Sequence, residues 1–143
     1  MCNFKVLGFV LLLILTPYVQ STEQMLIHVN TVERFVAAFN AQDSDAMASL
    51  VADDIEWLSI VSNEISVDAK GKTNLVESMD AYFKSCPTCR SELSEMVSTA
   101  SRVSALEVAS WQGKSGARSQ RAISVYEFSG GLITRVYYFP AEK

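Results

Sequence analysis

The sequence predicts an α+β domain in which three N-terminal helices pack on a mainly antiparallel sheet. Two observations predict this fold class. In the first part of the chain, apolar residues recur at intervals of three and four, which is the spacing of one helix face. From about residue 90, polar and apolar residues alternate in long runs separated by glycine-containing turns, which is typical of antiparallel strands.

The first 21 residues have the features of a secretory signal peptide. Lys5 supplies a positive charge, residues 6–15 form an apolar run, and Pro17 follows it. The run is about half as long as the roughly 20 apolar residues that span a membrane. We therefore expect cleavage after Ser21, a secreted or periplasmic location and no stable membrane anchor after cleavage. An uncleaved N-terminal anchor is the alternative. Residues 22–143 then form one domain.

The helical spacing is clearest around Val29, Val32 and Val36, which share a face with Phe39. The expected order of elements here is a helix over 25–40, a short helix capped by Asp43 or Ser44, a strand over 55–61, a loop through Asn63, Asp68 and Gly71, and a helix from about Thr73 to Pro87. The remaining chain is expected to form strands over 90–100, 102–112, 118–128 and 132–139. Glycine-containing turns at 113–116 and 129–131 join them as hairpins.

The charge balance limits the partners. Loss of Lys5 with the signal leaves 11 basic against 16 acidic side chains. No cluster of Lys and Arg could follow a phosphate backbone, so nucleic-acid binding is excluded. We expect no metal site and no cofactor, because His28 is the only histidine and zinc needs about four ligands. His28 itself is expected at the surface, near the start of the first helix.

Cys86 and Cys89 are the two cysteines that remain after cleavage, separated by two residues. In an oxidising compartment we expect a local disulfide between them. Two intervening residues are also the spacing of thiol oxidoreductases. Those enzymes place the first cysteine at a helix N-terminus, whereas Cys86 follows a predicted helix. A structural disulfide is therefore favoured, and redox chemistry is the alternative.

Three segments carry a resemblance to a known family: residues 34–40 with Asp43, residues 52–54, and the closing run 131–139. In these segments the chain resembles the NTF2-like superfamily, which includes SnoaL-like and ketosteroid isomerase-like domains. The resemblance implies a cone-shaped, strongly curved sheet with an internal pocket. It also implies a homodimer, a frequent arrangement in this fold. It does not fix a function, because the fold carries many activities.

Ketosteroid isomerases of this superfamily need a Tyr, a proton-transferring Asp and a hydrogen-bonding acid in the pocket. The resemblance places Phe35, Ser59 and Ser124 at those positions. Phe donates no hydrogen bond, and a serine without a basic partner is a poor general base. We therefore expect no ketosteroid isomerase chemistry, and no catalytic residue is assigned.

Arg135 and Tyr137 alternate on one face of the last strand, and the resemblance suggests that this face looks into the cone. Arg135 could then hold an anionic group. A structural ion pair between Arg135 and an acid such as Glu127 on the neighbouring strand is the favoured interpretation. Glu92, Glu95 and Glu107 alternate with apolar residues and are expected on the solvated face of the sheet.

Aromatic residues on the predicted inward faces are the remaining signal. A cone that its helices do not fill leaves space for a small apolar or aromatic ligand. The expected ligand-binding residues are Phe35, Phe39, Trp57, Ser59, Met79, Phe83, Trp111, Ser124, Tyr126, Arg135 and Tyr137. Three functions remain open: a binding protein without chemistry, a SnoaL-like enzyme that cyclises, isomerises or hydrolyses a small substrate, and a homodimerisation module.

Overall fold

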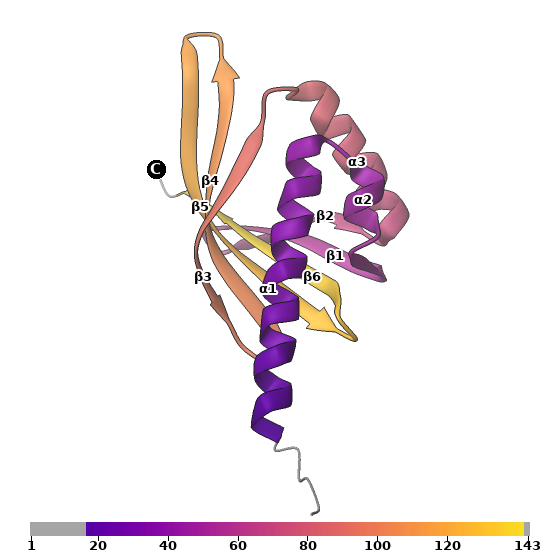
Figure 1. Cartoon of the computed structure of the whole chain (residues 1–143). Helices are drawn as coiled ribbons and strands as arrows, with labels where there is room; N and C mark the ends of the chain where they lie inside the picture. The colour runs from indigo at the N-terminus through magenta and orange to yellow at the C-terminus, as the bar shows by residue number, and fades with distance from the viewer. Residues whose placement is uncertain (1–16, 142–143) are drawn as a thin grey trace, which may run out of the picture.

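The computed structural model describes residues 17–141. Its elements are α1 (Pro17–Ala41), α2 (Ser44–Ala48), β1 (Val51–Val61), β2 (Glu64–Lys70), α3 (Lys72–Ser85), β3 (Arg90–Ser98), β4 (Arg102–Gly113), β5 (Gly116–Ser129) and β6 (Leu132–Pro140) (Figure 1). The last four strands begin and end close to the predicted boundaries. In the hairpin between β5 and β6, Gly130 and Gly131 adopt the left-handed backbone that a tight two-residue turn requires.

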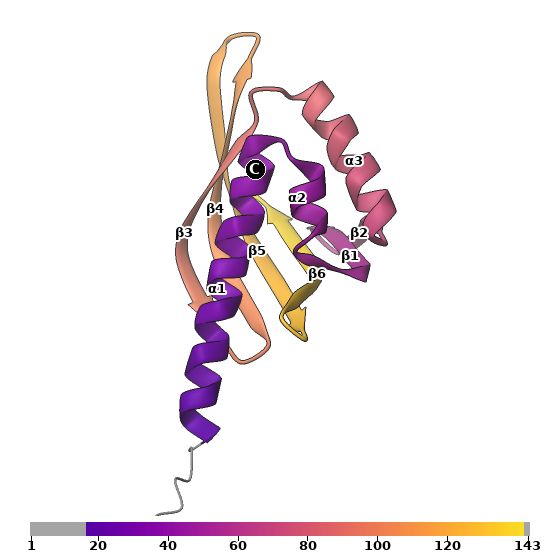
Figure 2. The ribbon, with the colours of Figure 1, turned by 45° about the vertical axis from the view of Figure 1, so that its right-hand side comes forward.

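One six-stranded sheet has the order β2-β1-β6-β5-β4-β3. Only the pairing of β1 with β6 is parallel, and the other four pairings are antiparallel. The helices lie on one face of this curved sheet, with α1 against β3 and β4 and α3 against β1 and β2 (Figures 1 and 2). The arrangement confirms the predicted α+β cone.

Helix α1 begins earlier than predicted, at Pro17 instead of Met25. Proline suits the first position of a helix, because its missing N–H would have no partner there. Residues 1–16 of the expected signal peptide lie outside the described residues, so cleavage after Ser21 stays a prediction. Within the described residues, no helix is both long enough and apolar enough to cross a membrane.

The short helix α2 has the predicted cap. The Asp43 side chain accepts a hydrogen bond from the backbone N–H of Ala46 at 2.8 Å. Ser44, the other candidate cap, instead donates to Asp80 of α3 at 2.5 Å. This contact ties α2 to α3, so the two helices cover the sheet together.

The region after α2 differs from the prediction. Strand β1 starts at Val51, not Ile55, and the expected loop contains strand β2. Only Ala69 of β2 is buried, so its side chains lack the strong inward pattern that identifies a strand. The backbone of Ser62, with a φ of 56°, turns the chain between β1 and β2.

His28 is buried in the core, which corrects the prediction that it lies at the surface. Its ring is 1% exposed and stacks on Phe128, with centroids 4.0 Å apart and planes 10° from parallel. Neither ring nitrogen has a hydrogen-bond partner among the described residues. Burial lowers the pKa of His28, so the neutral ring is favoured.

Candidate functional site

A cavity of about 640 Å³ lies between the helices and the inner face of the sheet. Its wall is mainly apolar and contains seven aromatic side chains: Phe35, Phe39, Trp57, Tyr82, Trp111, Tyr126 and Tyr138. Helices α1 and α3 supply three of these rings and the strands supply four. The size and the aromatic wall suit a small organic molecule.

The structure brings together seven of the eleven residues predicted to bind a ligand. Those that line the cavity are Phe35, Phe39, Trp57, Ser59, Met79, Trp111 and Tyr126. Phe83 lies in the core behind the wall, where its ring contacts Phe39 with centroids 5.4 Å apart. Ser124 is fully buried on the inner side of β5 but does not line the cavity.

Arg135 and Tyr137 lie on the outer face of the sheet, so the expectation that they look into the cone was wrong. Tyr138, between them and Phe139 in sequence, lines the cavity instead. The Arg135 guanidinium pairs with Glu56 at 3.0 Å and with Glu127 at 3.3 Å. The favoured interpretation, a structural ion pair with Glu127, therefore describes Arg135 correctly.

The contacts in this outer network shift the pKa values of Arg135 and Glu56. Hydrogen bonds to Tyr137 and Glu56 raise the pKa of Arg135. Hydrogen bonds from Lys70 and Arg135 lower the pKa of Glu56. Both groups are therefore charged, and because their side chains are partly exposed, solvent screens the pair and its contribution to stability is small. The network supplies no charge to the cavity.

Glu107 is a candidate site residue that the sequence interpretation missed. It was expected on the solvated face with Glu92 and Glu95, but it is only 6% exposed and lines the cavity. The predicted inward position of Trp111, four residues later in the same strand, carried the signal. Residues separated by an even number of positions in a regular strand share a face, so Glu107 had to point inward as well.

Two hydroxyl groups hold the Glu107 carboxylate. The Tyr126 hydroxyl donates to Oε1 at 2.6 Å, and the Ser91 hydroxyl donates to Oε2 at 2.8 Å. Burial and the nearby Glu107 charge raise the pKa of Tyr126 well above its ordinary value. The same two causes, burial first, raise the pKa of Tyr138. Both phenols therefore stay protonated at neutral pH.

The structure also shows the surroundings of Phe35, Ser59 and Ser124, the residues at the three positions that the isomerases use for catalysis. Phe35 is 1% exposed and lies near Trp57 and Tyr126, with ring centroids 6.0 and 6.1 Å away. The Ser59 hydroxyl donates to the Asp68 carboxylate at the exposed side of the cavity. The Ser124 hydroxyl is buried and has no hydrogen-bond partner among the described residues.

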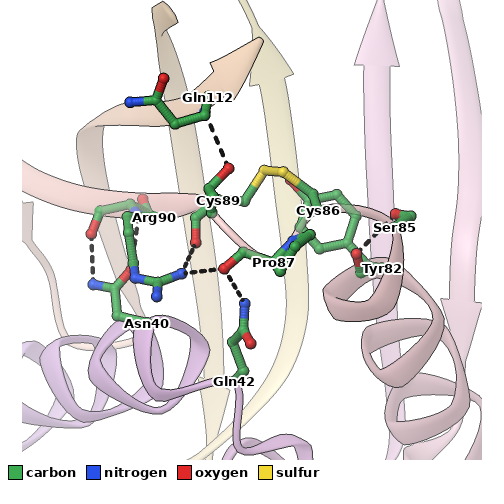
Figure 3. The surroundings of a disulfide bond; sticks show 11 residues. Asn40, Gln42, Tyr82, Ser85, Cys86, Pro87, Cys89, Arg90 and Gln112 are labelled. Carbon is green, nitrogen blue, oxygen red and sulfur yellow. Dashed lines mark hydrogen bonds between the residues drawn. A yellow bond between two sulfur atoms is a disulfide. The ribbon is translucent and has the colours of Figure 1, made fainter. Parts of the chain in front are cut away.

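A disulfide joins Cys86 and Cys89, which both line the cavity. Figure 3 shows the bond and the residues around it. The bond confirms the predicted pairing and joins the end of α3 to the start of β3. Gln42 of the segment after α1 donates to the Pro87 carbonyl at 2.9 Å, and the Gln112 N–H of β4 donates to Thr88 at 3.0 Å. The loop is thereby held from both sides.

Within residues 17–141, no group of three or more His, Cys, Asp or Glu side chains is placed to hold a metal ion. Among the described residues, the charged side chains of the cavity wall are Asp68, Arg90 and Glu107. Glu107 lies in the interior, whereas Asp68 and Arg90 are exposed residues of the same wall. The Arg90 guanidinium donates to the carbonyls of Cys89 and Pro87, at 2.6 and 3.2 Å.

Solved structures similar to this chain share its fold. An uncharacterised cystatin-fold protein from Novosphingobium aromaticivorans is 23% identical over 78% of this chain and 96% of its own, with a TM-score of 0.68. A putative polyketide cyclase from Xanthomonas campestris is 19% identical over 81% and 91%, with a TM-score of 0.60. A Mycobacterium tuberculosis protein solved with estradiol-17β-hemisuccinate is 17% identical over 78% and 92%, with a TM-score of 0.65.

No curated protein matches this chain in sequence. The sequence profile of the SnoaL-like domain matches residues 32–136. This range includes the C-terminal part of α1, the start of β6 and every cavity-lining residue except Tyr138. This match covers well over half of the chain and agrees with the observed cone. The chain therefore belongs to the SnoaL-like domain family of the NTF2-like superfamily.

Proposed function

We propose that the protein binds a small apolar or aromatic molecule in its cone without ketosteroid isomerase chemistry. The observation that carries this proposal is the 640 Å³ cavity, which is open and lined mainly by aromatic and apolar side chains. A collapsed cone would instead favour a purely structural or dimerisation role. Related folds solved with a steroid ester or described as a polyketide cyclase support a ligand of this general class.

Two features of the site argue against the isomerase reaction. In the cavity wall, Phe35 and Ser59 stand where the isomerases have a hydrogen-bond donor and a proton-transferring base. Ser124, at the position of the hydrogen-bonding acid, is buried and does not line the cavity. Arg135, the cation that an enzyme could use on an anionic substrate, is on the outer face. Purified protein should therefore show no ketosteroid double-bond isomerisation above the rate in buffer.

Binding can be tested with N-phenyl-1-naphthylamine, a neutral aromatic probe whose fluorescence rises in apolar sites. Ala109 lines the cavity, so Ala109→Phe should fill part of it and weaken binding by about tenfold, or 1.4 kcal/mol. Arg135→Met, on the outer face, should leave the affinity within about threefold of the wild type, less than 1 kcal/mol. Equal binding to all three proteins would place the probe outside the cavity and contradict the proposal.

Export is the second part of the proposal. Its support is the pattern of Lys5, the apolar run over 6–15 and Pro17. Protein recovered from the producing cell should begin at Thr22 and lie outside the cytoplasm. N-terminal sequencing that finds Met1 on a membrane-bound form would overturn export and favour the uncleaved anchor.

We also propose that a second copy of the chain covers the outer face of the sheet. Large apolar side chains are exposed there on strands that the sheet brings together: Ile65 (66%), Val67 (58%), Ile123 (53%) and Phe139 (36%). Ile123 pairs directly with Phe139. Contiguous apolar patches of this kind mark interaction surfaces. Ile123→Asp should yield monomer in sedimentation velocity, and a monomeric wild type would refute the homodimer.

A further inference from the structure

We infer that the cavity selects a ligand that carries a protonated amine on an aromatic or apolar body, with the ammonium group held by Glu107. The inference rests on the proposed binding function and names the chemical class of its ligand. Within the described part of the chain, Glu107 is the one carboxylate that the fold buries in the cavity wall.

No positive charge from the described residues balances the negative charge of the Glu107 carboxylate. The two groups that hydrogen-bond to it, Tyr126 and Ser91, are neutral hydroxyls. No basic side chain of residues 17–141 forms an ion pair with Glu107. A carboxylate taken out of water is costly unless a cation or several donors balance it. A bound ammonium group would provide the missing charge, and each carboxylate oxygen can accept a further hydrogen bond.

The wall around Glu107 favours the same ligand. Trp57, Trp111, Tyr126 and Phe35 line the cavity, and the faces of such rings attract cations electrostatically. The apolar body of the ligand would contact the same rings. An anionic ligand would meet both the Glu107 charge and the negative ring faces. The geometry therefore discriminates by charge as well as by size.

The other charges of the wall do not reverse this preference. Among residues 17–141, Arg90 is the only basic residue that lines the cavity, and its guanidinium donates to the Pro87 and Cys89 carbonyls. Asp68, also in the wall, adds a second carboxylate on the exposed side. Two acidic residues against one basic residue leave the lining with a net negative charge.

The test compares three matched probes by calorimetry near neutral pH: biphenylmethylamine, biphenylmethanol and biphenylcarboxylate. The amine should bind at least tenfold more tightly than the alcohol, and the carboxylate should bind most weakly. In Glu107→Gln the amine should lose about tenfold in affinity, while the alcohol should stay within threefold. Glu92→Gln, which removes the same charge from an exposed residue of β3, should leave the ranking unchanged.

The outcomes separate this inference from the proposed function. Equal affinities for the three probes in the wild type, or an amine preference that survives Glu107→Gln, would overturn the ammonium site and leave the binding function intact. Failure of all three probes to bind would overturn both. If Glu107→Gln does not fold, the wild-type ranking still decides, since it alone requires the amine to bind best.

Discussion

Removing the Tyr126 hydroxyl should measure how strongly the fold depends on its buried polar pair. The hydroxyl oxygen lies 2.6 Å from Glu107 Oε1, and the two residues are 2% and 6% exposed. Hydrogen bonds to charged groups contribute about 1.5–3 kcal/mol. Because Glu107 lines an open cavity, water can replace part of the lost bond. We therefore expect Tyr126→Phe to lower the free energy of unfolding by about 1.5–2 kcal/mol.

The assay is urea unfolding followed by circular dichroism, with the slope of the transition unchanged between variants. Tyr82→Phe is the matched control, because Tyr82 is 41% exposed and its hydroxyl makes no hydrogen bond that the structure shows. Its loss should stay below about 0.5 kcal/mol. In a Glu107→Gln background, Tyr126→Phe should cost only about 0.5–1 kcal/mol, because the remaining bond is neutral. An equal cost in both backgrounds would refute the charge-assisted bond.

Two further predictions concern stability. Replacing Cys86 and Cys89 together by Ser should lower the free energy of unfolding by about 1–2 kcal/mol, because the disulfide closes a very short loop; free thiols in unreduced, denatured protein would contradict the bond. Burial lowers the pKa of His28 below 6.5 in the folded state, so the unfolded chain binds the proton more readily. Stability should therefore fall as the pH drops below about 6.5, and His28→Leu should remove that part of the pH dependence; an unchanged profile in the variant would refute it.

Much of the fold could be predicted because periodicity and turn residues report on burial. The helical spacing of α1, the Asp43 cap and the glycines of the last hairpin all act locally, and each appears where the sequence predicts it. Strand β2 was missed for the same reason. Its side chains are almost all exposed, so hydrogen bonding to β1 defines it, and the sequence does not display that pairing.

The cavity was harder to predict than the fold, because its details depend on which face of each strand points inward. The aromatic wall followed from alternation, but alternation leaves two choices of face for every strand. In β6 the wrong face was chosen, so Arg135 and Tyr137 were assigned to the cavity in place of Tyr138. In β4 the assumption that charged residues face water hid Glu107. A buried acid breaks the rule that places most residues correctly, and such exceptions gather at functional sites.

The parallel pairing of β1 with β6 sets the order in which the domain can be completed. Val51 pairs with Ile133 and Trp57 with Val136, so the middle of the sheet joins the first strand to the last. Contacts so distant in sequence form slowly, and they require the C-terminal segment to have been synthesised. Before β6 docks, β1 and β5 are open edges, and the wall that Tyr138 completes does not exist. A chain truncated before Leu132 should therefore be prone to aggregation and have no binding chamber.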